Sequence, residues 1–229
     1  MAGGAGGGVW AVLVAAGRGE RLASKRPKAF AKLRDRPLLA ESVERLEASE
    51  WVDAIVVVAP PDWEEPSILV AEEVAAGKVV ACVTGRATRL DSVRAGIEEV
   101  PDDAAIVLVH DAARPLLPLD VVDRVLAPLG EGFDGAVPGL PVPDTLKRVE
   151  GDAIVETVSR DGLYTVQTPQ AFLAEPFRRA LEGFSGEATD CAGVVEANSG
   201  RVAVVVGDRR LVKVTTSADL ALVETLLAP

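Results

Sequence analysis

The sequence predicts an α/β protein built on a mostly parallel, doubly wound sheet. Short runs of β-branched residues alternate along the chain with amphipathic segments at helical spacing, which is the pattern of βαβ units. The 229 residues are 48% hydrophobic, enough for a sizeable buried core. No domain-sized linker or internal repeat interrupts the alternation, so we expect one domain over residues 9–229.

The first elements follow this alternation in order. Val9–Ala15 is an uninterrupted apolar run and predicts a buried strand. Leu38–Ala48 carries leucine and valine near helical spacing and predicts a helix. Ile55–Ala59 predicts a second strand, which must end at the two prolines that follow it. Ser67–Ala75 predicts the next helix.

The alternation continues through the middle of the chain. Val79–Val83 predicts a third strand, Asp91–Glu99 a helix and Ala105–His110 a fourth strand. A further helix should end at Leu126, and Gly135–Val137 predicts another short strand.

A segment rich in proline and glycine then breaks the pattern. Thr145–Glu150 and Ala153–Ser159 predict two strands joined by a turn at Gly151. Such a hairpin has few apolar residues for a core and is not stable alone. We therefore expect this hairpin to pack on something outside its own domain, such as a second subunit.

The last part of the chain should close the domain. Gln170–Leu181 and Asp190–Ala197 predict helices, and Val202–Val206 and Leu211–Val214 predict strands. A terminal helix is expected over Ser217–Leu227, with Ser217 as its N-cap.

Charge and cysteine content exclude several classes of protein. A net charge of −11 argues against general nucleic-acid binding, which needs a clustered basic surface. The two cysteines form no disulfide framework and favour a reducing, cytoplasmic location. No apolar run is long enough to span a membrane. Residues 1–8 lack the features of a secretory signal and are expected to be a flexible leader.

A glycine turn after the first strand gathers positive charge. Residues 18–36 hold eight Lys or Arg against two acidic residues, although the whole chain is acidic. Small residues let backbone N–H groups approach a polyanion, so this loop predicts phosphate binding. Leu22 stands where a dinucleotide-binding loop has its third glycine, and no Gly-Lys-Ser/Thr sequence of a P-loop occurs.

Two more loops follow predicted strands and should meet the first at the carboxyl edge of the sheet. Residues 84–92 combine glycine with basic residues before a helix, and Ser92 could cap that helix or help to bind an anion. Asp111 is placed to hold a metal–nucleotide complex, or else to cap a turn. His110 is the only histidine, so a packed side chain is favoured over a metal ligand.

Together these motifs resemble a known family. They are Val14-Ala15-Ala16-Gly17-x-Gly19-x-Arg21, Pro27-Lys28, Arg89-x-Asp91-Ser92, His110-Asp111-Ala112-Ala113-Arg114-Pro115, Asp144-Thr145-x-Lys147, Gln167-Thr168-Pro169-Gln170, Thr189-Asp190 and Lys213-Val214-Thr215. In this order they are similar to the 2-C-methyl-D-erythritol 4-phosphate cytidylyltransferases of non-mevalonate isoprenoid synthesis. The resemblance implies a Rossmann-like nucleotidyltransferase fold, transfer of CMP from CTP to the sugar phosphate, and Mg²⁺. It also implies a homodimer joined by a protruding β-arm at about residues 139–163, which matches the predicted hairpin.

The resemblance also implies roles for individual residues. The catalytic residues would be Arg21, Lys28, Arg160 and Lys213. The CTP-binding residues would be Ala15, Ala16, Gly17, Gly19, Gly85, Ser92, Asp111 and Ala112, with Asp111 near the metal. The residues that hold the sugar phosphate would be Arg114, Thr145, Arg160, Thr168, Thr189 and Lys213, those on the arm serving the partner's site.

Three alternatives remain open. A cytidylyltransferase acting on ribitol 5-phosphate would share the nucleotide loops. A nicotinamide-dependent oxidoreductase is disfavoured by Leu22. A non-catalytic nucleotide-binding module would bind CTP without releasing pyrophosphate. The sequence also departs from the family at Arg86, where a second glycine is usual.

Overall fold

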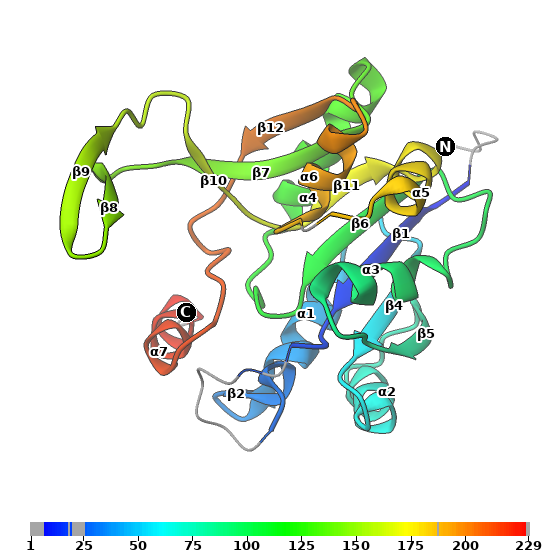
Figure 1. Ribbon diagram of the computed structural model, residues 1–229. Coiled ribbons are helices and arrows are strands. Elements are labelled where there is room, and N and C mark those ends of the chain that lie inside the picture. The colour runs from blue at the N-terminus through cyan, green and yellow to red at the C-terminus, as the bar shows by residue number, and fades with distance from the viewer. Residues whose placement is uncertain (1–6, 18, 20–25, 187, 228–229) are drawn as a thin grey trace.

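The computed structural model describes residues 7–17, 19, 26–186 and 188–227. A twisted sheet runs through the molecule, with helices on both of its faces (Figure 1). Within the described residues its strand order is β10-β7-β11-β6-β1-β4-β5, and β12 pairs with the outer side of β7. The predicted mostly parallel α/β sheet is therefore confirmed.

The parallel half of the sheet contains the first four predicted strands. They are β1 (Val9–Val14), β4 (Ala54–Ala59), β5 (Val79–Thr84) and β6 (Ile106–Asp111). β1 lies between β4 and β6, and β5 pairs with the far side of β4, all in parallel. Since parallel strands end at the same edge, the loops that follow β1, β5 and β6 lie together.

The other half of the sheet mixes directions. β11 (Gln170–Leu173) runs antiparallel between β6 and β7 (Gly135–Pro141). β12 (Val202–Val206) is parallel to β7, and β10 (Tyr164–Val166) is antiparallel to it.

Side chains of β1 alternate between the two faces, as the period of a strand requires. Leu13 belongs to a core with α1 (Leu38–Glu47), α2 (Glu64–Glu73) and α4 (Leu119–Leu126). Val12 belongs to the opposite core, with helices α3 (Arg89–Ile97), α5 (Ala174–Gly183) and α6 (Cys191–Ala197). This two-sided burial is what a doubly wound sheet requires.

Smaller elements complete the fold. They are the short helices η2 (Lys28–Phe30) and η3 (Ala127–Glu131), the small hairpin of β2 (Lys32–Leu33) with β3 (Arg36–Pro37), and α7 (Ser217–Leu226). α7 packs through Val223 on Leu33 and Val214, in a separate apolar cluster.

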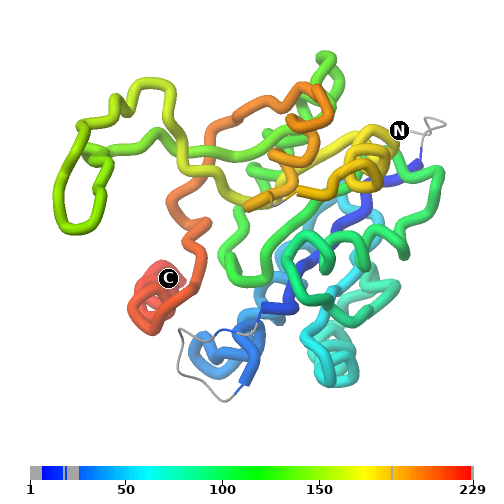
Figure 2. Tube along the Cα trace, viewed as in Figure 1, coloured from blue at the N-terminus to red at the C-terminus, as the bar shows by residue number. Residues whose placement is uncertain are grey.

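The predicted arm is present as a hairpin of β8 (Leu146–Glu150) and β9 (Ala153–Val158). Gly151 occupies its turn with a φ of +57°. The hairpin stands away from the rest of the chain (Figure 2).

Three details of the predicted elements are wrong. Gln170–Leu173 is a strand, because β6 and β7 pair with both of its edges, and the helix begins only at Ala174. Leu211–Val214 forms no strand and is tied to the loop after β6 by a bond from the Val214 N–H to the Ala113 carbonyl. The N-cap of the last helix is Thr216 and not Ser217, because Thr216 accepts the Asp219 N–H in a capping box.

Candidate active site

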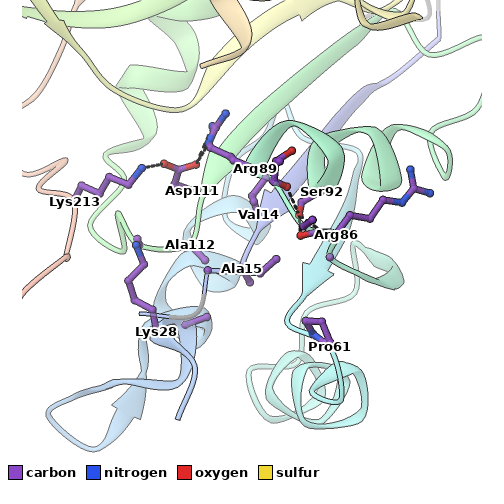
Figure 3. Close-up of a pocket in the computed structure, with 17 residues that line it drawn as sticks. Val14, Ala15, Lys28, Pro61, Arg86, Arg89, Ser92, Asp111, Ala112 and Lys213 are labelled. Atoms are coloured by element: carbon purple, nitrogen blue, oxygen red, sulfur yellow. Dashed lines mark hydrogen bonds and ion pairs between the residues drawn. The ribbon is translucent and has the colours of Figure 1, made fainter. Parts of the chain in front are cut away.

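A cavity of about 510 Å³ opens at the carboxyl ends of the parallel strands. Its walls come from the loop after β1, the turn between β5 and α3, and the segment after β6, with Lys28 and Lys213 at its border (Figure 3). The predicted meeting of these three loops is confirmed. Of the residues expected to bind CTP, the cavity is lined by Ala15, Ala16, Gly17, Gly85, Ser92, Asp111 and Ala112.

Asp111 is the electrostatic centre of this cavity. Its Oδ1 accepts two hydrogen bonds from Arg89, from Nε at 3.0 Å and Nη2 at 2.9 Å. Its Oδ2 accepts one from Lys213 Nζ at 2.7 Å. The two cations approach the carboxylate from opposite sides (Figure 3). A chain segment 102 residues away thus completes the site through Lys213.

Burial and ion pairing act in opposite directions on this carboxylate. The side chain of Asp111 is only 8% exposed, and burial alone would raise its pKa. The charges of Arg89 and Lys213 outweigh burial and hold its pKa well below the usual range. Asp111 is therefore an anion at neutral pH.

His110 lies behind Asp111 and is fully buried. Its Nδ1 is 3.1 Å from Thr168 Oγ1, and its Nε2 is 3.1 Å from the Arg114 carbonyl oxygen. Burial lowers the pKa of His110 to about 4, so it is neutral at pH 7. The expectation of a packed histidine is confirmed.

The turn after β5 is held by Ser92. Its Oγ accepts the Arg86 N–H at 2.9 Å and donates to the Thr88 carbonyl at 2.9 Å. Thr88, and not Ser92, is the N-cap of α3. The hydroxyl of Ser92 thus shapes the cavity wall.

Gly85 and Arg86 define how close this turn comes to the first loop. A Cβ on Gly85 would lie 2.2 Å from the Cβ of Ala16, so no side chain fits between the two loops. Arg86, where the family usually has glycine, donates from Nη2 to Glu98 at 2.5 Å. Its guanidinium lies outside the cavity (Figure 3).

The loop after β1 brings Lys28 to the cavity. Gly19 has a φ of +72°, and a Cβ there would lie 2.7 Å from the Cβ of Lys28. The Lys28 N–H donates to the Gly17 carbonyl at 3.3 Å. Gly19 therefore lets Lys28 approach this loop closely, and Lys28 borders the cavity. Arg21, the other expected catalytic residue of this loop, lies outside the described residues.

The expected sugar-phosphate residues are not all at the cavity. Thr145 and Arg160 are exposed at the base of the arm, where Arg160 donates to the Pro143 carbonyl. Thr189 is exposed just before Asp190, the N-cap of α6. Arg114 donates to the Leu211 carbonyl at 2.6 Å and does not line the cavity.

Sequence reasoning missed one residue of the site, Arg89. Its guanidinium pairs with Asp111, and Nη1 lies 3.6 Å from Cys191 Sγ. One signal was available in the sequence: Arg89 is a basic residue at the end of a loop that was already expected to lie near Asp111.

A family model described as "2-C-methyl-D-erythritol 4-phosphate cytidylyltransferase" matches residues 9–229. The chain belongs to this family. Membership excludes the nicotinamide-dependent alternative.

Named relatives agree along nearly the whole chain. A 2-C-methyl-D-erythritol 4-phosphate cytidylyltransferase of Frankia casuarinae is 44% identical over 96% of this chain and 81% of its own length. The protein of that name from Saccharopolyspora erythraea is 44% identical over 96% of this chain and 99% of its own.

Solved structures of the cytidylyltransferase family share the fold. The Thermus thermophilus enzyme superposes with a TM-score of 0.77 at 34% identity, over 94% of this chain and 96% of that one. A structure titled 4-diphosphocytidyl-2C-methyl-D-erythritol synthase gives a TM-score of 0.82 at 32% identity, covering 97% and 99%.

Proposed function

We propose that this chain is a cytidylyltransferase that transfers CMP from CTP to 2-C-methyl-D-erythritol 4-phosphate in isoprenoid precursor biosynthesis. The products are 4-diphosphocytidyl-2-C-methyl-D-erythritol and pyrophosphate. The observation that carries the proposal is the buried Asp111 anion in a cavity bordered by a glycine loop and by Lys28 and Lys213. The comparisons give no support to the ribitol 5-phosphate alternative.

The reaction itself needs charge neutralisation more than proton transfer. A phosphate oxygen of the sugar phosphate attacks the α-phosphorus of CTP in line, the new P–O bond forms, and the bond to pyrophosphate breaks. The attacking phosphate is already ionised at neutral pH, so no general base is needed. Catalysis therefore rests on positioning and on electrostatic stabilisation of the five-coordinate phosphorus.

Lys28 and Lys213, both at the border of the cavity, suit that task. We assign Lys28 and Arg21 to the triphosphate and to the charge that develops at the α-phosphorus. The close approach of Gly85 to Ala16 joins the loops after β5 and β1 into one wall of the cavity, against which the nucleotide would lie. Lys213, already beside Asp111, is assigned to the incoming sugar phosphate.

A divalent cation, Mg²⁺ in our proposal, is compatible with this donor set. The described residues contain no group of three His, Cys, Asp or Glu that could hold an ion on their own. Mg²⁺, however, commonly uses one or two carboxylates together with substrate phosphates. Asp111 is ionised and lines the cavity, so its carboxylate is the residue that would hold the ion. When bound, Mg²⁺ supplies positive charge to the phosphate oxygens.

We further propose that residues 9–229 act as one domain in a homodimer, with the arm reaching the partner. Val149, Ile154 and Val155 on the hairpin are each at least half exposed. Such apolar exposure on an isolated hairpin indicates a protein contact. Thr145 and Arg160 at the base of the arm would then contact the sugar phosphate in the partner's cavity, while Arg114, Thr168 and Thr189 serve this one.

A cytoplasmic location is part of the same proposal. It is supported by Cys82 and Cys191, both of which are free thiols. Within the described residues, no helix is both long and apolar enough to cross a membrane.

The test is pyrophosphate release with CTP, UTP or ATP against each of the two sugar phosphates. We expect release with CTP and 2-C-methyl-D-erythritol 4-phosphate. Release with ribitol 5-phosphate in its place would favour the sister activity. Binding of CTP without any pyrophosphate would identify a non-catalytic module.

A further inference from the structure

The single histidine of the chain links three segments of the site. His110 is 0% exposed and lies at the end of β6, directly before Asp111. Its two ring nitrogens contact Thr168, which precedes β11, and the backbone of Arg114. The mechanism above gives this side chain no task, yet both of its polar atoms are engaged.

The partners determine where its proton lies. A carbonyl oxygen only accepts, so the contact of 3.1 Å to Arg114 requires a proton on Nε2. A charged imidazolium would be costly at a fully buried position, so Nδ1 is left without a proton and accepts the Thr168 hydroxyl. The Thr168 oxygen in turn accepts the Asp111 N–H at 3.1 Å.

From this directed chain of hydrogen bonds we infer that neutral His110, protonated on Nε2, is a positioning residue that orients Asp111 through Thr168. It anchors the Thr168 hydroxyl so that a lone pair of the oxygen faces the Asp111 backbone. Its other nitrogen fixes the carbonyl of Arg114, three residues after Asp111. The inference rests on the proposed function, because His110 is assigned to orienting the Asp111 carboxylate for that reaction.

The same hydrogen bonds also change the role of Thr168. Its hydroxyl proton is used by His110, so the side chain has no donor left for a phosphate oxygen. It is also only 4% exposed. Thr168 therefore supports Asp111 from behind, and any direct contact with substrate can only be as an acceptor.

The hydrogen-bond chain is tested without the reaction by NMR. Because His110 is the only histidine, untagged protein labelled with ¹⁵N-histidine reports its two ring nitrogens alone. At neutral pH we expect a protonated Nε2 and an unprotonated Nδ1, and Thr168→Val should shift the Nδ1 resonance most. A proton on Nδ1, or no response to Thr168→Val, would overturn the inference.

The positioning role is tested by kinetics. Thr168→Val should lower kcat about tenfold with a smaller change in KM for CTP, as is common when a supporting hydrogen bond to a functional group is lost. Thr168→Ser, which keeps the hydroxyl, should recover most of that loss. Thr225→Val, an exposed threonine on α7, is the matched control for the threonine-to-valine change.

Variants of His110 test the contacts of its two ring nitrogens separately. Asn can replace the Nδ1 acceptor, whereas Gln can replace the Nε2 donor to Arg114. We expect His110→Asn to keep more of kcat than His110→Gln, and the double variant His110→Gln/Thr168→Val to lose little beyond Thr168→Val.

The outcomes remain distinct from those of the proposed function. Failure of the unmodified chain to release pyrophosphate would refute the proposed function. If the unmodified chain is active but Thr168→Val keeps its kcat, only the role of His110 is refuted. The same holds if the losses of kcat from His110→Gln and Thr168→Val multiply in the double variant. If His110 variants do not fold, the comparison of Thr168→Val with Thr168→Ser decides.

Discussion

At the scale of residues, the site depends on a few charges held close to one carboxylate. Asp111 forms ion pairs with two cations, Arg89 and Lys213, and neutralises part of the charge that they would otherwise leave at the cavity. Both oxygens are engaged from the protein side, so the carboxylate is ionised and oriented before any substrate arrives. This preorganisation is what electrostatic catalysis requires.

Replacing Asp111 should therefore destabilise the fold. Asp111→Asn leaves Arg89 and Lys213 without a counter-charge. Because these cations are 25% and 38% exposed, the loss should be smaller than for a fully buried pair, about 1–3 kcal/mol. The measurement is urea unfolding at neutral pH. Asp120→Asn is the control, because its exposed pair with Arg124 on α4 contributes about 0.5 kcal/mol. Equal losses for the two variants would contradict a structural role for the Asp111 pairs.

Lys28 should act on the rate and not on the fold. Lys28→Ala removes a cation at the cavity, and the loss of one such donor costs roughly 3–4 kcal/mol, or on the order of 10²–10³ in kcat. Arg21→Ala should behave alike. Circular dichroism should show unchanged folding, and pyrophosphate release should show the lower kcat.

Lys32→Ala is the matched control for Lys28→Ala. Lys32 lies four residues on in β2, is exposed, and does not line the cavity. Near-normal turnover of Lys28→Ala would remove Lys28 from the catalytic role.

At the scale of elements, local signals and tertiary pairing compete. The buried strands β1, β4 and β6 follow directly from apolar runs, because few other structures bury every side chain of such a run. The segment Gln170–Leu173 reads as helix from its neighbours, yet it fills the gap between β6 and β7. Pairing with these two strands determines that the segment is a strand, and no local sequence pattern predicts that pairing.

The α7 N-terminus provides a pH-dependent element. Asp219 Oδ2 accepts the N–H groups of Thr215 and Thr216, each at 2.8 Å, and the hydroxyl of Thr215 at 2.6 Å. These hydrogen bonds, that of the Thr215 side chain first, lower the pKa of Asp219 from 3.8 to about 2. A lowered pKa means that the stabilisation is full above pH 3.8 and is lost as the pH falls towards 2.

Asp219→Asn should therefore lower the free energy of unfolding by about 1 kcal/mol at pH 7. The difference from the unmodified chain should shrink as the pH falls from about 4 towards 2. Urea unfolding at several pH values measures it. A difference that is constant across this range would show that the carboxylate charge is not the stabilising feature.

At the scale of the whole molecule, the arm is the feature that the fold of one chain does not explain. Its two strands pair with each other and form a separate two-stranded sheet. An isolated hairpin of this kind is at best marginally stable in water. The proposed dimer accounts for both the stability of the hairpin and its apolar surface.

Charge on the arm should therefore weaken the proposed dimer. Val155→Asp places a carboxylate on the exposed face of β9, and we expect a shift towards monomer with lower activity per chain. Sedimentation equilibrium measures the first effect and pyrophosphate release the second. Val80→Asp on β5 is matched in residue type and exposure, 56% against 50%, and should leave the dimer intact. A monomeric unmodified chain, or an unchanged dimer of Val155→Asp, would refute the proposal.

The sequence by itself determined the class of fold, the order of the parallel strands and helices, the arm, and the three loops that form the cavity. It could do so because the spacing of apolar residues, the positions of proline and glycine, and the ends of apolar runs are all local features of the sequence. Only the tertiary structure decided that Arg89 and Lys213 flank Asp111, that His110 and Thr168 support it from behind, and that Gln170–Leu173 is a strand. These contacts join segments from about 20 to 100 residues apart, and no local periodicity encodes which of many polar side chains will meet.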